Sequence, residues 1–169
     1  GHSFVKEAVH RGAVAVMVRR RIPGLRVPQV VVRDTDRALG DLGRAQRLQW
    51  GGPLVAVTGS AGKTTVKDMI AHLLGGEPRV LKTRGNLNNQ YGLPLTLMRL
   101  GKKHRAAVVE LGINRPGEMG WLTEVARPDV AAVMNIGFSH IGNFGGQRAL
   151  AREKLAITKG LRTKGVLIL

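Results

Sequence analysis

A short apolar strand that runs into a glycine-rich turn and then a helix is the feature that most constrains this chain. The apolar run 53–57 leads directly into Thr58-Gly59-Ser60-Ala61-Gly62-Lys63-Thr64-Thr65. Glycines let the backbone curl so that successive N–H groups face one anion, toward which the next helix points its positive end. A lysine and a threonine placed there can reach phosphate oxygens and Mg²⁺. The segment predicts a phosphate-binding loop; the alternative is a glycine-rich turn whose lysine binds nothing.

The residues after the loop have the periodicity of a helix over 63–74. Its expected inward face has the spacing i, i+3, i+4, i+7, i+8 and consists of Val66, Met69, Ile70, Leu73 and Leu74. The longer form of this loop carries a glycine where Val57 stands, so the loop in this chain is the shorter Gly-x-x-Gly-Lys-Thr. We therefore expect a compact loop between a strand and a helix.

Composition excludes several classes of protein. Of the 169 residues, 43% are hydrophobic and none is cysteine, which allows a packed core but no disulfide or zinc–thiolate site. No apolar run approaches the ~20 residues of a membrane span, and no signal peptide is visible, so a cytoplasmic location is expected. The net charge of +16 fits either a basic surface that attracts anions or nucleic-acid binding. Scattered basic residues and only 4% aromatics favour the former.

Short apolar strands alternate with helices along the chain. We expect strands at 13–18, 29–33, 54–58, 79–82, 105–110, 130–136 and 165–169, and helices at 3–11, 35–50, 63–74, 94–100, 116–126 and 147–160. This alternation predicts an α/β fold with a doubly wound, mostly parallel sheet. Gly51-Gly52-Pro53 predicts a boundary between 1–50, the end of a small α/β domain, and 51–169. Asp34-Thr35 is expected to cap the helix 35–50, with Ala38, Leu39, Leu42 and Leu48 facing inward.

Polar residues stand at the ends of the expected strands. Glu110 ends one strand, Asn135 lies at the end of another, and His140 follows shortly after. Because the carboxyl ends of parallel strands meet at the ligand-binding edge of such a sheet, these residues are expected to share a site with the loop. Glu110 is placed to hold Mg²⁺, unless it is a helix cap or a surface acid. A lone histidine such as His140 is either functional or an ordinary surface or core residue.

Two further groups of residues allow a functional and a structural interpretation. Asn86, Asn88 and Asn89 follow the strand 79–82, and their amides can bind a polar ligand or build Asx turns. Lys154 lies in the expected helix 147–160, where a lysine is by default exposed to solvent.

Together these segments resemble the Mur ligase family. The resemblance is carried by 58–65, by 83–97, by 110–114 with Pro116-Gly117-Glu118, and by 135–137 with His140; upstream, 1–5 and 34–40 are similar to the end of the family's N-terminal domain. The Asn-x-Asn-Asn-x-x-Gly-x-Pro-Leu-Thr stretch, residues 86–96, is the most specific part. It points to the members that join D-alanyl-D-alanine to UDP-N-acetylmuramoyl-tripeptide. It argues against ligases that add diaminopimelate or lysine, and against folylpolyglutamate synthases.

The resemblance implies an ATP-dependent ligase of peptidoglycan precursor synthesis. In this family ATP phosphorylates the terminal carboxylate of the UDP-linked tripeptide, and the amine of D-alanyl-D-alanine attacks the acyl phosphate. The cofactors implied are ATP and Mg²⁺. No nucleic-acid partner is expected, and the full-length protein is expected to be a monomer.

The resemblance also implies roles for individual residues. Thr58, Gly59, Ser60, Ala61, Gly62, Lys63, Thr64, Thr65 and Asn135 would bind the nucleotide, and Asn86, Asn88 and Asn89 the substrate. Lys63, His140 and Lys154 would be catalytic. Thr64 and Glu110 would hold one Mg²⁺, with His140 and a carbamylated Lys154 holding a second. The chain departs from the family's Ala-Lys-x-Glu-Ile pattern, because Ala156 stands where the acid is common.

Both ends of the chain look cut, so we expect a fragment. Residues 1–50 would be the last part of the family's N-terminal, UDP-substrate domain, and 51–169 the first part of its central ATP-binding domain. The segment on its own is expected not to catalyse ligation.

Overall fold

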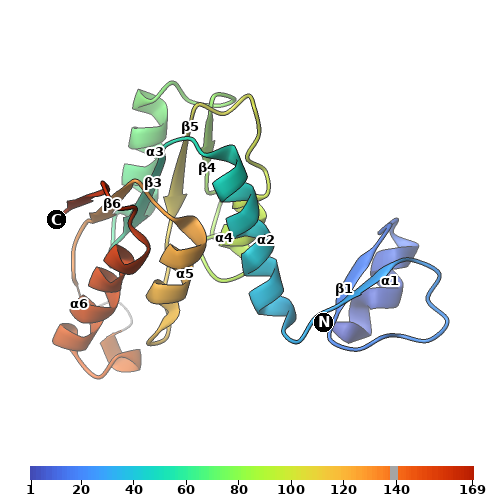
Figure 1. Ribbon diagram of the computed structural model, residues 1–169. Coiled ribbons are helices and arrows are strands. Elements are labelled where there is room, and N and C mark those ends of the chain that lie inside the picture. The colour runs from blue at the N-terminus through green and yellow to red at the C-terminus, as the bar shows by residue number, and fades with distance from the viewer. Residues whose placement is uncertain (138–140) are drawn as a thin grey trace. The chain divides into compact units, whose positions relative to one another are not determined.

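The computed structural model describes residues 1–137 and 141–169 and divides the chain into two compact units (Figure 1). The first unit is Gly1–Leu39. It contains η1 (His2–Phe4), α1 (Val5–His10) and two short parallel strands, β1 (Val16–Val18) and β2 (Gln29–Val31). The expected helix 3–11 and the two expected strands are therefore present, although the strands are shorter than their apolar runs.

Helix α2 (Thr35–Trp50) begins in the first unit and continues in the second, Gly40–Leu169. It starts at the expected cap, because the Asp34 carboxylate accepts hydrogen bonds from the backbone N–H groups of Arg37 and Asp36, which lower the pKa of that carboxyl. The compact units thus divide earlier than Gly51-Gly52-Pro53, because most of α2 packs within the second unit.

The expected inward face of α2 is wrong for Leu42 and Leu48, which are exposed. The buried residues of α2 are Gly40, Gly43 and Arg47, one stripe at i, i+3 and i+7. A Cβ on Gly40 would overlap the Trp121 ring, and one on Gly43 would lie 2.7 Å from Pro94 Cα. The helix is therefore packed at backbone distance through glycines, which a search for apolar periodicity does not detect.

The second unit is built on a five-stranded parallel sheet in the order β4-β5-β3-β6-β7. Strand β3 (Leu54–Thr58) is central, between β5 (Ala106–Glu110) and β6 (Val130–Val133), with β4 (Val80–Lys82) and β7 (Val166–Ile168) at the edges. From β3 the chain runs first to the edge strand β4, returns to β5 beside β3, and then crosses to the other side through β6 and β7. This confirms the doubly wound α/β fold and makes the end of β3 the point where the winding reverses.

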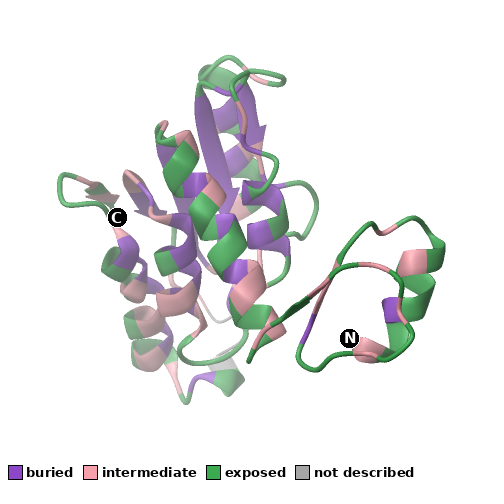
Figure 2. Ribbon diagram, turned by 45° about the vertical axis from the view of Figure 1, so that its right-hand side comes forward, coloured by how far each residue is buried: buried purple, intermediate pink, exposed green. Residues whose placement is uncertain are grey.

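Helices cover both faces of this sheet (Figure 2). On one face the buried core joins Leu54 and Ala56 of β3 to α4 (Gly92–Leu97), α5 (Glu118–Ala126), α6 (Gln147–Leu155) and η3 (Ala156–Gly160). On the other face Val55 and Val57 pack with α3 (Lys63–Leu73). Successive residues of one strand point to opposite faces, so both sets of β3 residues are apolar, as expected of a central strand.

The inward face expected for α3 is only partly correct. Val66 and Ile70 pack on the sheet, but Met69, Leu73 and Leu74 are exposed, and the fully buried residues are Ala71 and Lys67. Lys67 can be buried because its ammonium group donates to the Thr83 carbonyl at 2.9 Å and lies 3.3 Å from an Asp68 carboxylate oxygen.

His104 gives the second unit a predicted pH dependence. It is buried, its Nδ1 accepts a hydrogen bond from the Gly101 N–H, and burial, followed by Lys103 and Arg99, lowers its pKa. Since the unfolded chain takes up this proton more readily, the free energy of unfolding should fall as the pH drops below about 6.5. Urea unfolding at a series of pH values should show this fall in the wild type and a flatter profile for His104→Gln. The exposed control His72→Gln should keep the wild-type slope.

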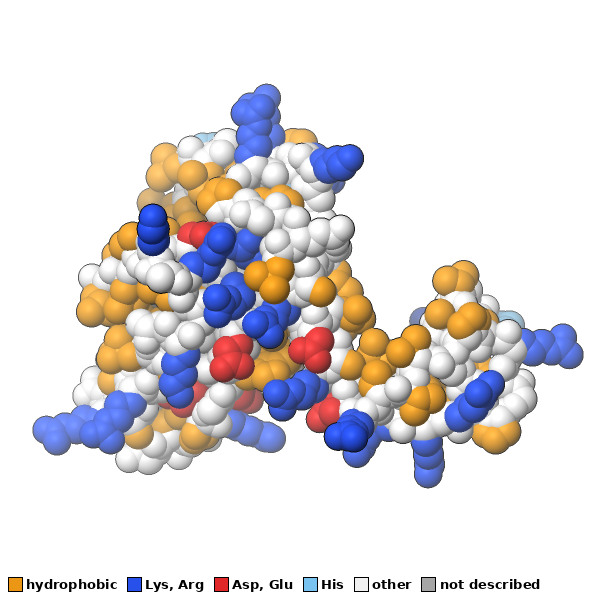
Figure 3. Space-filling view, viewed as in Figure 1, with side chains coloured by type: hydrophobic (Ala, Val, Ile, Leu, Met, Phe, Trp, Pro, Cys, Tyr) orange, Lys and Arg blue, Asp and Glu red, His pale blue; other side chains and the backbone are white. Residues whose placement is uncertain are grey.

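The surface carries basic side chains on both units. Lys and Arg side chains are spread over the visible face, with acidic groups among them, rather than joined in one patch (Figure 3). Within residues 1–137 and 141–169, no helix combines the length and apolarity needed to cross a bilayer.

Candidate nucleotide-binding site

The glycine-rich loop joins β3 to α3 at the carboxyl edge of the sheet. A Cβ on Gly59 would lie 3.0 Å from Met134 Cβ and 3.4 Å from the Asn135 backbone nitrogen, so this glycine allows the loop to approach the end of β6. Gly62 has a φ of 76°, a left-handed conformation that turns the chain into α3. Val57, at the position of the missing third glycine, is completely buried in the core. The short loop therefore needs only two glycines.

Asn135 holds the loop through its side-chain amide. Its Oδ1 accepts hydrogen bonds from the Ser60 and Ala61 N–H groups, both at 3.0 Å, and its Nδ2 donates to the Ala61 carbonyl, also at 3.0 Å. The Ser60 hydroxyl in turn accepts from the Gly137 N–H. Two of the loop's N–H groups are thus engaged by Asn135. The first N–H groups of a helix such as α3 have no intrahelical acceptor and are suited to an anion at the loop.

Replacing Asn135 with alanine should loosen the loop. Net contributions of about 1 kcal/mol per hydrogen bond predict a roughly 10- to 100-fold weaker affinity for ADP. Calorimetric titration with ADP and Mg²⁺ measures this loss. Asn143→Ala is the matched control, because Asn143 is exposed and its amide donates to the Asn114 carbonyl, away from the loop. Equal affinities for the two variants would show that the loop is ordered without Asn135.

Lys63, the first residue of α3, folds back over the loop. Its Nζ donates to the Gly59 carbonyl at 2.9 Å, which keeps the ammonium group on the rim of the phosphate cradle. The neighbouring Thr64 hydroxyl donates to Glu110 Oε2 at 2.8 Å. The expected association of the loop with Glu110 at one edge of the sheet is therefore present in the structure.

Glu110 is buried, with two hydrogen bonds to its carboxylate and one from its backbone N–H. Besides the Thr64 hydroxyl, the Asn88 amide donates to Glu110 Oε1 at 2.9 Å, and the Glu110 N–H donates to the Thr83 hydroxyl at 3.0 Å. The same Thr83 accepts from the buried Lys67 through its carbonyl. Neither Thr83 nor Lys67 was predicted as a site residue. The sequence gives no signal for Lys67, which lies in a helix with several other polar residues and outside its predicted inward face.

The asparagine loop serves several structural roles. Asn89 Oδ1 accepts from the Tyr91 and Gly92 N–H groups and so caps α4, which is the Asx interpretation. Asn88 points to Glu110, and its amide lies where a Cβ on Gly112 would collide with it. Asn86 is exposed, and its carbonyl accepts from the Asn88 N–H. Substrate contacts by these three residues remain a prediction.

Lys154 is buried, contrary to the default expectation for a helical lysine. Only 4% of the residue is exposed, and burial, followed by the charge of Lys63, lowers its pKa to about 8. The two lysines therefore share one electrostatic environment at the loop. The adjacent Glu153 carboxylate accepts a hydrogen bond from the Met119 N–H at the start of α5.

The donor set around the loop suits magnesium. A hydroxyl and one carboxylate beside a phosphate cradle are the ligands that Mg²⁺ uses together with phosphate oxygens and waters. No cluster of three or more histidine, aspartate or glutamate side chains occurs among the residues described. His140, expected as a further ligand, lies outside the described residues.

The glycine loop lies where the winding of the parallel sheet reverses. It is followed by a lysine and by a threonine that is hydrogen-bonded to a carboxylate. These features define a P-loop nucleotide-binding domain of the α/β class. Comparison with known families narrows this class. Residues 57–169 match the Mur ligase middle domain, and the chain belongs to that family.

Similar proteins agree with this assignment. The chain is 42% identical over 172 residues to the UDP-N-acetylmuramoyl-tripeptide–D-alanyl-D-alanine ligase of Haemophilus influenzae, covering 99% of this chain and 38% of the relative. Among solved structures, the UDP-N-acetylmuramoylalanyl-D-glutamyl-2,6-diaminopimelate–D-alanyl-D-alanyl ligase from Acinetobacter baumannii superposes with a TM-score of 0.91 at 41% identity, covering 99% and 37%. MurF ligase from Thermotoga maritima in complex with ADP gives 0.88 at 34%, covering 98% and 39%. The chain thus spans less than two fifths of these relatives.

Proposed function

We propose that this chain forms the nucleotide-binding part of an ATP-dependent ligase that joins D-alanyl-D-alanine to UDP-N-acetylmuramoyl-tripeptide in peptidoglycan precursor synthesis. The observation that carries the proposal is the Gly59–Thr64 loop with Thr64 bonded to the buried Glu110, in a chain about 40% identical to such ligases. A structural relative of the same family was solved with ADP, which supports the nucleotide assignment. The proposed location is the cytoplasm.

The chemistry makes a specific demand on these residues. A substrate carboxylate must approach the γ-phosphate of ATP, so two anionic groups meet in the transition state. Lys63 at the rim of the loop and the backbone N–H groups at the start of α3 would stabilise this charge. Asn135 would hold the loop in its conformation, and Asn88 would keep the Glu110 carboxylate oriented toward Thr64, while Thr83 would fix the Glu110 backbone.

Thr64 and Glu110 are the proposed magnesium ligands in this chain. When bound, Mg²⁺ would neutralise charge on the β- and γ-phosphate oxygens. Lys154 is a proposed site of carbamylation, which requires a neutral amine. Its pKa of about 8 supports this role, because a sizeable fraction of the side chain is uncharged near that pH.

The deciding experiment is phosphate release from ATP by protein that contains this segment. Release should require both UDP-N-acetylmuramoyl-tripeptide and D-alanyl-D-alanine. Release with neither substrate present, or release supported by a free amino acid in place of the dipeptide, would contradict the assignment.

A further inference from the structure

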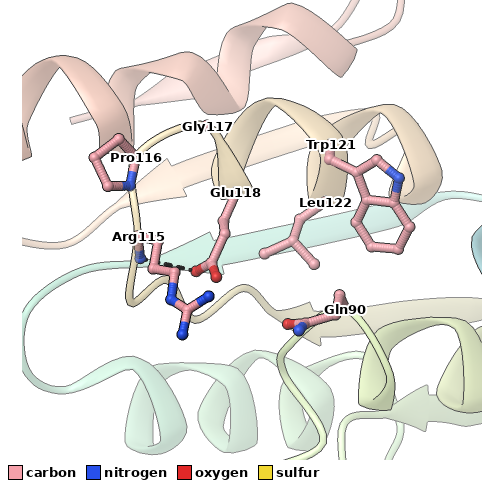
Figure 4. A pocket seen from close by; sticks show the side chains of 7 residues that line it. All are labelled: Gln90, Arg115, Pro116, Gly117, Glu118, Trp121 and Leu122. Carbon is pink, nitrogen blue, oxygen red and sulfur yellow. Dashed lines mark hydrogen bonds between the residues drawn. The ribbon is translucent and has the colours of Figure 1, made fainter. Parts of the chain in front are cut away.

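A cavity of about 440 Å³ lies beside the Glu110 site, on the same edge of the sheet (Figure 4). It lies where the loop before α4 meets the first turn of α5, and it is lined by Gln90, Arg115, Pro116, Gly117, Glu118, Trp121 and Leu122. The two segments that form it both lead away from Glu110: Gln90 follows Asn88, which bonds Glu110, and Arg115 follows the strand that Glu110 ends. A ligand in this cavity would therefore reach toward the phosphate loop.

The Arg115 guanidinium supplies the positive charge of the cavity. Figure 4 shows it on the same side of α5 as the Gln90 amide and the side chains of Leu122 and Trp121. Within the described part of the chain, no carboxylate forms an ion pair with this guanidinium. Glu118 also lines the cavity, but no ion pair joins its carboxylate to Arg115; one of its oxygens accepts from the Asn114 and Arg115 backbone N–H groups. A cation on the wall of a cavity favours an anionic ligand.

The other walls indicate which anion fits. Trp121, Leu122 and Pro116 are apolar, and Gln90 offers a single amide, so the cavity suits a chain of methylene groups that ends in one carboxylate. A diphosphate needs several donors or cations, whereas here one guanidinium shares the rim with the Glu118 carboxylate. The first turn of α5 adds little, since the Met119 N–H already donates to Glu153.

We infer that this cavity binds the peptide part of the UDP-linked substrate, with Arg115 pairing with a carboxylate of that peptide that does not react. This rests on the proposed function. The peptide named for the Acinetobacter relative, alanyl-D-glutamyl-2,6-diaminopimelate, has such carboxylates on flexible aliphatic chains. Arg115 would thereby set the preference for the acidic peptide and hold its reacting end toward Lys63.

The test compares Arg115→Met with Arg105→Met by calorimetric titration. Arg105 is an exposed arginine that precedes β5, so it lies at the amino ends of the parallel strands, opposite the cavity. The ligands are UDP-N-acetylmuramic acid without peptide, the diaminopimelate tripeptide, the lysine tripeptide, which lacks one carboxylate, and a tripeptide with its glutamyl carboxylate amidated. Arg115→Met should weaken the diaminopimelate tripeptide about 10- to 100-fold, the usual effect of losing a charged hydrogen bond. It should leave the ligand without peptide unchanged, and the loss should vanish for one of the two carboxylate-deficient ligands.

An equal loss for the ligand without peptide would overturn the inference, because it would indicate a diphosphate site. A loss that is the same for all tripeptides, or no loss for any of them, would also contradict it. Absence of tripeptide binding by the wild-type chain would also overturn it. Failure of the proposed function is seen separately, as absence of ADP and Mg²⁺ binding by the wild type, which does not involve Arg115.

Discussion

Replacing Lys63 with alanine should lower ATP-dependent phosphate release about 10²–10³-fold, the usual effect of removing one preorganised charge from a phosphoryl-transfer site. The Lys63 ammonium lies over the loop at 2.9 Å from the Gly59 carbonyl, where a γ-phosphate can replace that carbonyl as its partner. Phosphate release by protein containing this segment and calorimetric titration with ADP and Mg²⁺ measure the effect. The loss in release should exceed the loss in ADP affinity, because ADP lacks the γ-phosphate.

The matched control for this variant is Lys164→Ala. Lys164 is exposed and precedes β7, so it lies at the amino ends of the parallel strands, opposite the loop. Its substitution removes the same charge without touching the loop. A comparable loss for both variants would mean that net charge, and not the position of the Lys63 ammonium, attracts the nucleotide.

Replacing Arg47 with methionine should lower the free energy of unfolding of the second unit by about 3–5 kcal/mol, the usual cost of removing one partner of a buried ion pair. Arg47 is only 1% exposed. Its guanidinium donates to an Asp129 carboxylate oxygen at 2.8 Å and to the carbonyls of Ala126 and Arg127 at the end of α5, and it lies over the Trp50 ring. Methionine fills much of the space but leaves those carbonyls without this donor.

Urea unfolding of Arg47→Met and Arg44→Met measures this effect. Arg44 lies on the exposed side of the same helix, so its variant should differ from wild type by less than about 0.5 kcal/mol. Similar stabilities for both variants would mean that Arg162 and the Leu54 N–H, the other partners of Asp129, hold that carboxylate without Arg47.

The sequence alone was sufficient for the order of elements and the place of the loop. All seven strands and the main helices occur where the apolar runs and breakers predicted, and the expected strand 54–58 is identical to β3. Both signals are local: burial on both faces makes a central strand uniformly apolar, and a tight loop requires glycines at set positions. Glu110 was identified for the same reason, as a charged residue at the end of an apolar strand.

Only the tertiary structure decided which side chains are buried and what each polar group contacts. Apolar periodicity placed Leu42, Leu48, Met69 and Leu73 inside, yet they are exposed, while Arg47, Lys67 and Lys154 are buried. Burial of a charge depends on a carboxylate, carbonyl or neighbouring charge that is distant in sequence, as Asp129 is from Arg47. The sheet likewise brings together the segments in which Asn135 hydrogen-bonds to the loop, and those that form the Arg115 cavity. The local sequence does not specify such partners. The fold, the loop and Glu110 were therefore predictable, whereas the contacts that hold the site together were not.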